Sequence, residues 1–318
     1  YEEIWIIFLS PTLLFPILSF LYLSPNFTNM PINKRSYQLL GLLVIVWGSS
    51  FLLIDRALLF FSPEQVVGYR LVIGAVTMLG IALYYRKTFP RSITPWLHFI
   101  VYAVIGNILP YLLIATGQLT ITSGMAGLLM AFMPLVTLVL AHIFLPNDKL
   151  NRFKVLGFII GISGVLFILG PSINNGNNTL FGILLVLSAA CAYAINTIIA
   201  SRLPSYDPLI SSTGVLIVAS LLSFLLWPSI FFIDFSNIPL ISGVSIILLG
   251  ALPTGFAALL YFIIINTAGA TFLSNINYLI PVVAFFLGAL LLGEDILWQN
   301  ILALLLIISG IFISRRRS

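Results

Sequence analysis

Polar side chains recur at spacings of three, four or seven residues inside otherwise apolar segments, and a helix would bring each group onto one face. The groups are Asn107, Tyr111 and Gln118; Ser274, Asn277, Tyr278 and Pro281; Thr254 and Tyr261; Tyr193 and Asn196; Trp47 and Ser50. Amides, hydroxyls and aromatic rings of this kind suit the binding of a neutral or zwitterionic small molecule with some apolar body. In the alternative interpretation, they hydrogen-bond between helices and hold a bundle together.

Arg70 is the one lysine or arginine well inside an apolar segment. An arginine at the centre of a membrane helix costs roughly 2.5–3.5 kcal/mol on insertion scales. Arg70 is therefore a partner for an anionic group of a substrate, or else a side chain that snorkels to the interface or tethers a gate. Both interpretations stay open at this point.

Acid–base and metal chemistry lack the residues that they need. No carboxylate lies deep in an apolar segment, and the two histidines, His98 and His142, fall near segment ends. A membrane enzyme would need clustered His, Asp or Glu near one interface. We therefore expect no enzyme activity, no catalytic residues, no metal and no cofactor, and we assign no ion-coupling site.

Membrane helices must position these groups, because the chain has too little charge to cover a surface that faces water. Hydrophobic residues make up 60% of its 318 residues and charged residues 7%, against about 25% charged in soluble proteins. The net charge of +5 is better explained by basic loop anchors than by nucleic acid, and one cysteine, Cys191, excludes a disulfide framework. The expected partners are a small-molecule substrate and the lipid bilayer.

Ten apolar segments have the length of a membrane span, which takes about 20 residues to cross about 30 Å of hydrocarbon. They cover residues 37–59, 66–85, 96–118, 122–145, 153–170, 180–201, 209–231, 241–265, 270–292 and 297–313. The sequence predicts an all-α integral membrane protein of ten transmembrane helices. Residues 1–36 precede them as an N-terminal extension, which is either translated upstream sequence or contains an extra hydrophobic span.

Lysine and arginine set the orientation of the spans. If the first span begins in the cytoplasm, twelve of the fourteen lie on the cytoplasmic side: Lys34, Arg35, Arg86, Lys87, Arg91, Lys149, Arg152, Lys154, Arg202, Arg315, Arg316 and Arg317. The outer loops then hold mainly acids: Asp55, Glu64, Asp234, Glu294 and Asp295. We expect a multi-pass protein of the inner or plasma membrane with both termini in the cytoplasm.

The chain contains an internal repeat. The stretch 123–150 resembles 270–297, with Pro134 matching Pro281 and Asp148 matching Asp295, both 147 residues apart. Two halves follow, 37–170 and 180–314, with five spans each. An odd number of spans makes the second half enter the membrane from the opposite side, and such inverted repeats are typical of secondary transporters.

Prolines occur in corresponding spans of the two halves. Pro110 matches Pro253, and Pro134 matches Pro281. Interrupted helices in corresponding positions indicate a binding site at the midplane of an inverted-repeat transporter. We interpret the four prolines as hinges in bent helices that line a cavity; the alternative is a packing kink without contact to substrate.

The order of several motifs carries a family resemblance. WGSSF (47–51), Arg70-Leu71, GLLMAFMPLVTLVL and KVLGFIIGISGVLFI are followed in the second half by NINYLIPVVAFFLGALLLGEDI and LLLIISGIF. Residues 37–314 thus resemble the drug/metabolite transporter superfamily, specifically its EamA-type ten-helix branch. Two departures are Ser50, where the family often has asparagine, and Asp148, where it often has glutamate. The resemblance implies a metabolite exporter or exchanger that works by alternating access.

The predicted function is export or exchange of a small neutral or zwitterionic metabolite, such as an amino acid. A carrier of sugar nucleotides or phosphorylated metabolites is the main alternative, although it should need several cations in its cavity and only Arg70 is available. A non-transporting membrane scaffold is the other. The small-residue stripe Gly157, Gly161 and Gly164 indicates close helix packing, either within one subunit or in a homodimer.

Overall fold

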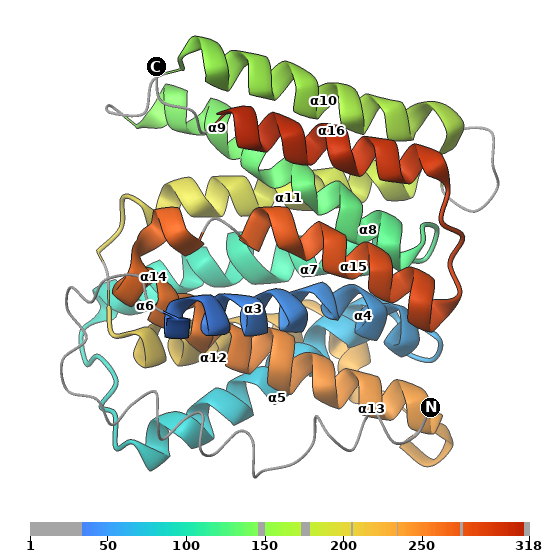
Figure 1. Cartoon of the computed structure of the whole chain (residues 1–318). Coiled ribbons are helices and arrows are strands. Elements are labelled where there is room, and N and C mark those ends of the chain that lie inside the picture. The colour runs from blue at the N-terminus through green and yellow to red at the C-terminus, as the bar shows by residue number, and fades with distance from the viewer. Residues whose placement is uncertain are drawn as a thin grey trace.

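The computed structural model describes residues 34–145, 150–172, 179–204, 206–233, 235–273 and 276–314. Within these ranges the secondary structure is helical (Figure 1). Residues 1–33, Asp148 and Ser274, which carry predictions made above, lie outside the described ranges.

The first half supplies five spans, several of them interrupted. They are α3 (Lys34–Gly48) with α4 (Ser50–Leu58); α5 (Pro63–Tyr84); α6 (Ile93–Ala103), the π-helix η1 (Val104–Ile108) and α7 (Leu109–Gly117); α8 (Ser123–Leu129), the 3₁₀ turn η2 (Met130–Phe132) and α9 (Met133–Phe144); and α10 (Arg152–Ser172).

The second half repeats this order. Its spans are α11 (Leu180–Ala200); α12 (Pro208–Leu226); α13 (Leu240–Leu249), the π-helix η5 (Gly250–Phe256) and α14 (Ala257–Leu273); α15 (Ile276–Leu292); and α16 (Trp298–Ser314). Two short 3₁₀ turns, η3 (Pro228–Phe231) and η4 (Phe235–Asn237), precede α13. Among the described residues, seven helices are long and apolar enough to cross a membrane, and α15 and α16 are shorter apolar helices.

The helices begin where the sequence supplies caps. Ser62 accepts a hydrogen bond from the backbone of Gln65 at the start of α5, and the side chain of Gln65 accepts one from the backbone of Ser62. The Asp207 carboxylate caps α12 in the same way, through the backbone N–H groups of Leu209 and Ile210. Such caps supply partners for the N–H groups that have none at a helix start.

The helices pack as two inverted halves. Three spans lie against their own repeat counterparts, namely α5 against α12, α8 against α15, and α10 against α16 (Figure 1). The contact of α4 with α13 has its equivalent in the contact of α11 with α7. The protein is therefore an all-α integral membrane protein of ten transmembrane helices in two inverted five-helix repeats, as the sequence predicted.

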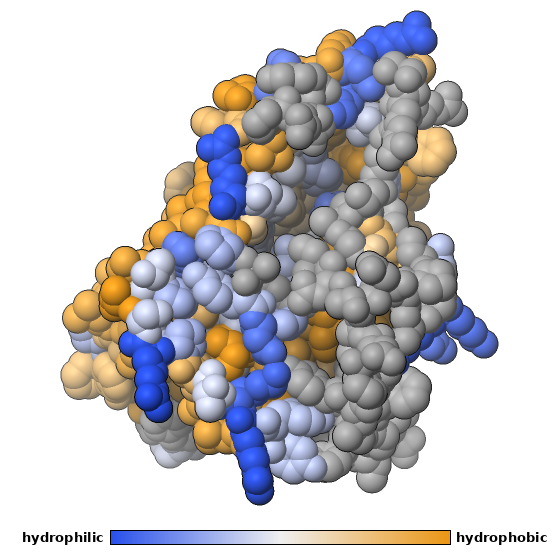
Figure 2. Space-filling view, turned by 90° about the vertical axis from the view of Figure 1, so that its left-hand side faces the viewer, coloured by the Kyte–Doolittle hydropathy of each residue, from blue (hydrophilic) through white to orange (hydrophobic). Residues whose placement is uncertain are grey.

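The two ends of the bundle differ in chemistry. Figure 2 shows one end directly, where hydrophilic side chains project beyond the apolar flanks. Exposed basic residues at the helix ends on this side include Lys34, Arg86, Arg91, Arg152 and Arg202. We call this side the basic end and the other side the opposite end.

The glycine stripe of α10 packs inside the subunit. A Cβ atom added at Gly157 would lie 2.3 Å from the carbonyl oxygen of Gly310 on α16, and one at Gly164 would lie 2.9 Å from that of Ala303. Glycine thus allows α10 and α16 to approach to backbone contact. The glycine stripe therefore serves helix packing within one subunit, and it gives no support to the predicted homodimer.

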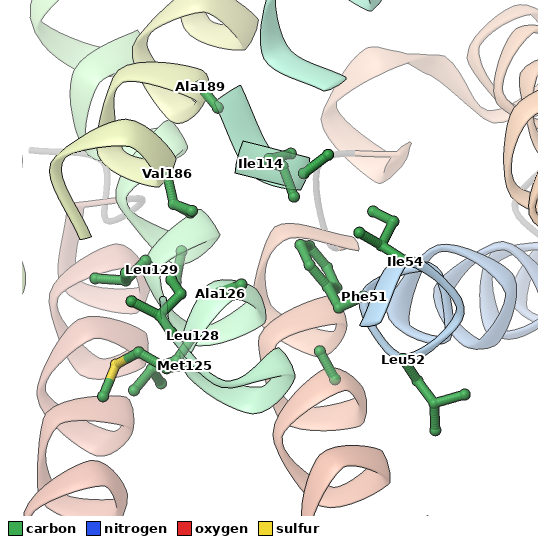
Figure 3. Packing of buried hydrophobic residues seen from close by; sticks show 14 of the residues in the cluster. Phe51, Leu52, Ile54, Ile114, Met125, Ala126, Leu128, Leu129, Val186 and Ala189 are labelled. Atoms are coloured by element: carbon green, nitrogen blue, oxygen red, sulfur yellow. The ribbon is translucent and has the colours of Figure 1, made fainter. Parts of the chain in front are cut away.

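A hydrophobic core surrounds α8 at the opposite end. All seven residues of α8 are buried. Figure 3 shows Phe51 of α4 pointing toward the space between Ala126 of α8 and Ile114 of α7, with Leu129 and Val186 close by. This packing joins α4, α7 and α8 of the first half to α11 of the second.

Candidate functional site

Arg70 lies in the interior of the bundle, where the two halves meet. Its side chain leaves only 4% of the residue exposed, and Nε donates a hydrogen bond of 3.0 Å to Thr254 Oγ1 on η5. The guanidinium carbon lies 3.6 Å from the centre of the Tyr111 ring on α7. This burial excludes the snorkelling interpretation of Arg70.

The Arg70 charge has no carboxylate partner among the described residues. The ion pairs found there join Arg56 to Asp55 and Lys87 to Asp207. A buried cation normally needs a paired or hydrogen-bonded environment. Tyr111 supplies a cation–π contact, worth about 2 kcal/mol or more when desolvated, and Thr254 supplies one acceptor. The Nη atoms form no hydrogen bond within the described part of the chain, so they can receive an acceptor from a ligand.

Two widened helical turns flank this position in corresponding spans. Pro253 lies inside η5, and Pro110 is the second residue of α7, which follows η1. Because Pro253 has no N–H, it cannot make the α-helical bond to the Leu249 carbonyl, and Thr254 Oγ1 donates a hydrogen bond of 2.8 Å to that carbonyl. In the other span, Asn107 Nδ2 of η1 donates to the Tyr102 carbonyl of α6 at 3.0 Å. π-Helical turns of this kind occur frequently at functional sites.

Tyr193 and Asn196 approach the same region from α11. Tyr193 is close enough to interact electrostatically with both Arg70 and Tyr111. The Asn196 amide packs on Gly106 of η1, where a Cβ atom would lie 2.7 Å from Nδ2. Asn196 Oδ1 is buried without a hydrogen-bond partner among the described residues. A buried acceptor without a hydrogen bond lowers the stability of the fold by about 1–3 kcal/mol unless a ligand or water pairs with it.

An aromatic pair contacts η5. The Trp47 and Tyr261 rings are 5.8 Å apart, and Trp47 Nε1 donates to the Pro253 carbonyl at 3.0 Å. The ten-helix bundle therefore brings together most of the predicted side chains from both halves. We define the Arg70 cluster as Arg70, Tyr111, Tyr193, Asn196 and Thr254, with Trp47 and Tyr261 as an adjoining aromatic pair.

Other predicted residues serve the bundle. The Tyr278 hydroxyl donates to the Ile311 carbonyl of α16 at 3.2 Å, beside half-buried Asn277. Ser50 Oγ donates to the Trp47 carbonyl of its own helix turn. Gln118 Nε2 donates to the Phe51 carbonyl of α4 at 2.9 Å. For these three hydroxyl and amide groups, the structure favours the inter-helix or local interpretation.

The proline pair Pro134 and Pro281 differs from the pair in the π-turns. Pro134 follows the 3₁₀ turn η2, which interrupts the fourth span, whereas Pro281 lies inside the continuous helix α15. The two prolines match in sequence but interrupt their helices to different extents. Their role as hinges remains a prediction.

Both histidines make hydrogen bonds at the ends of helices. A ring nitrogen of His98 lies 2.7 Å from the Tyr206 hydroxyl, and His142 Nδ1 accepts from the Leu150 backbone at 3.2 Å. Among the described residues, no three His, Cys, Asp or Glu side chains gather as metal ligands would.

Glu294 makes a contact that sequence reasoning missed. Its two carboxylate oxygens accept backbone hydrogen bonds from Ser123 and Gly124, each 2.8 Å long. Burial raises the pKa of Glu294 above its ordinary 4.5, although the two N–H groups oppose the shift. The nearby charge of Asp55 raises this pKa further. The sequence shows Glu294 next to Gly293 in a loop, but it does not show that the partner is Ser123, 171 residues away.

Several known proteins of similar sequence are named as transporters. An uncharacterized transporter of Bacillus subtilis (strain 168), YoaV, is 30% identical over 85% of this chain and 93% of its own. An uncharacterized transporter of Archaeoglobus fulgidus is 27% identical over 89% and 99%. A protein of known crystal structure, 18% identical, aligns with a TM-score of 0.66 over 89% of this chain and 97% of its own, which shows the fold alone.

The family comparison covers both halves. The model of the EamA-like transporter family matches residues 35–170 and again residues 180–316. The two matches fall on the two inverted halves and leave out the N-terminal extension. The chain therefore belongs to the EamA-like transporter family and is a multi-pass membrane transporter.

Proposed function

We propose that the protein exports or exchanges a small neutral or zwitterionic metabolite, such as an amino acid, and binds it at the Arg70 cluster. The observation that carries the proposal is the buried Arg70 guanidinium, which contacts Tyr111 in its own half and Thr254 in the other half and has no carboxylate partner among the described residues. A carboxylate is the group that best complements a guanidinium, because it can accept two parallel hydrogen bonds.

The surroundings of Arg70 limit the charge of the substrate. Tyr111, Tyr193, Asn196 and Thr254 are uncharged, so the cluster balances one negative charge. The unpaired Asn196 Oδ1 offers an acceptor to an ammonium group. A zwitterion could pair its carboxylate with Arg70 and its ammonium group with Asn196 Oδ1. A sugar nucleotide or phosphorylated metabolite would bring more negative charge than one arginine neutralises.

Alternating access follows from the inverted halves. We infer that the basic end faces the cytoplasm, so that the first span begins there and the last span ends there, in keeping with the rule that cytoplasmic loops are rich in lysine and arginine. The cell membrane is the expected location. The widened turns η1 and η5 lie at corresponding positions and lack regular helical hydrogen bonds, so they are suited to bend as the halves rock.

A binding screen followed by flux measurements tests the proposal. The purified protein is screened by thermal shift against amino acids, nucleosides, sugar nucleotides and other small metabolites, because a ligand of the folded state raises its melting temperature. Hits are then tested for exchange in proteoliposomes. We expect zwitterionic hits whose flux is lost in Arg70→Ala and kept in Arg56→Ala, which removes an arginine near the opposite end.

Three results would contradict this proposal. Hits confined to sugar nucleotides or phosphorylated compounds would favour the carrier alternative. Binding without flux in wild-type proteoliposomes would favour a non-transporting role. Flux at the wild-type rate with Arg70→Ala would remove Arg70 from the binding site.

A further inference from the structure

We propose that Glu294 is a latch that holds the two halves together at the opposite end of the bundle and keeps that end closed. The inference goes beyond the substrate site and takes from the proposed function only that the halves alternate. Glu294 follows α15 in the second half, and its partners Ser123 and Gly124 begin α8 in the first half. The contact therefore bridges the two halves at that end.

The bonds at this position are suited to a latch. Each carboxylate oxygen accepts one backbone N–H at 2.8 Å, and hydrogen bonds to a carboxylate are stronger than those between neutral groups. Ser123 and Gly124 are both buried. If Glu294 left, their N–H groups would lose a partner where water does not easily replace it.

Two glycines make room for the carboxylate. A Cβ atom at Gly124 would lie 2.7 Å from Glu294 Oε2, and one at Gly288 on α15 would lie 2.6 Å from the same atom. The pocket is thus built from both halves. Below it, α8 is buried along its whole length against α15 and the core around Phe51 (Figure 3).

The two copies of the repeat differ at the position that precedes the matched aspartates. In the register that aligns Pro134 with Pro281 and Asp148 with Asp295, Glu294 corresponds to Asn147, an uncharged amide. At the basic end the described cross-half contacts include the ion pair of Lys87 with Asp207 and the hydrogen bond of Arg202 to the Phe144 carbonyl. The latch acts at the opposite end and favours closure there, and this is the outer end in the proposed orientation. A substrate would then load from the cytoplasm.

Distance measurements between two spin labels test the latch without any substrate. The labels replace Leu119 and Ile296, which are exposed and flank the two partners, after Cys191 is replaced by serine. In proteoliposomes, Glu294→Ala should raise the ratio of long to short label distances by at least about tenfold, the effect of losing one charged hydrogen bond. Asp295→Ala, which removes the neighbouring acid, should leave the ratio unchanged.

A second variant covers the case in which Glu294→Ala does not fold. Gly124→Ala places a methyl group against Oε2 and should raise the same ratio with Glu294 still present. Glu294→Ala and Gly124→Ala distributions that match Asp295→Ala would overturn the proposal. Because the labels report distance alone, a protein that transports none of the screened metabolites would still support or refute the latch.

Discussion

The guanidinium carbon of Arg70 lies 3.6 Å from the centre of the Tyr111 ring, and Nε of the same arginine reaches Thr254 across the boundary between the halves. The Tyr111 ring therefore contacts the buried positive charge of Arg70 directly. Tyr111→Phe should keep this contact, while Tyr111→Leu should remove it and cost about 2 kcal/mol of stability, the size of a desolvated cation–π contact.

Thermal unfolding in detergent measures this difference. The melting temperature of Tyr111→Phe should stay close to that of the wild type, and that of Tyr111→Leu should fall. If both variants melt alike, the ring does not stabilise Arg70. Binding adds a second readout: a loss of affinity in Tyr111→Phe with an unchanged melting temperature would assign the hydroxyl to the substrate.

The close approach of α10 to α16 predicts that alanine lowers the stability at one glycine and not at another. A methyl group at Gly157 would lie 2.3 Å from the Gly310 carbonyl oxygen, a backbone atom that cannot rotate away. Gly157→Ala should therefore lower the melting temperature and the yield of folded protein. Gly41→Ala is the matched control, since nothing lies within 4 Å of its added carbon, and alanine favours a helix by roughly 1 kcal/mol over glycine.

The latch should respond to pH in a defined direction. Burial raises the pKa of Glu294 above its ordinary 4.5, Asp55 on α4 adds to the shift, and the backbone N–H groups oppose it. If opening exposes the carboxyl, the closed form has the higher pKa and binds the proton more tightly. Closing then takes up protons between the ordinary and the raised pKa, and the closed population should grow as the pH falls through that interval.

The spin-label distances described above measure this response. Glu294→Gln cannot titrate and should make the distances independent of pH over that interval. Asp55→Asn removes the like charge, so it should move the response to lower pH; Arg56, 3.7 Å from Asp55, stays in place. A closed population that shrinks on acidification would show that the hydrogen bonds, and not burial, control the pKa of Glu294.

The sequence predicted the helices and their inverted halves because both depend on local patterns. Apolar runs give the spans, and the repeat of Pro134 at Pro281 gives the register. It could not predict the π-helical turn at Pro253, since a proline removes one helical hydrogen bond but does not decide whether the helix kinks or widens. The Glu294 contact was hidden for another reason: it depends on the path of a loop relative to a helix of the other half.

The last prediction concerns Pro253 and the turn that it widens. Alanine at this position restores an N–H that can bond to the Leu249 carbonyl, which Thr254 Oγ1 now occupies. A regular turn would draw Thr254 away from Arg70 and stiffen η5, so turnover should fall more than substrate binding weakens. Initial exchange rates in proteoliposomes and the Kd from thermal shift measure the two effects separately.

Pro281→Ala is the matched control, because Pro281 lies in the continuous helix α15 and no widened turn depends on it. If η5 is the hinge, Pro253→Ala should slow exchange more than Pro281→Ala does at equal amounts of folded protein. Equal slowing by both would assign the effect to helix bending in general. A lower melting temperature of Pro253→Ala with an unchanged rate per folded molecule would instead mean that the π-turn serves packing, and that the halves rock about another point.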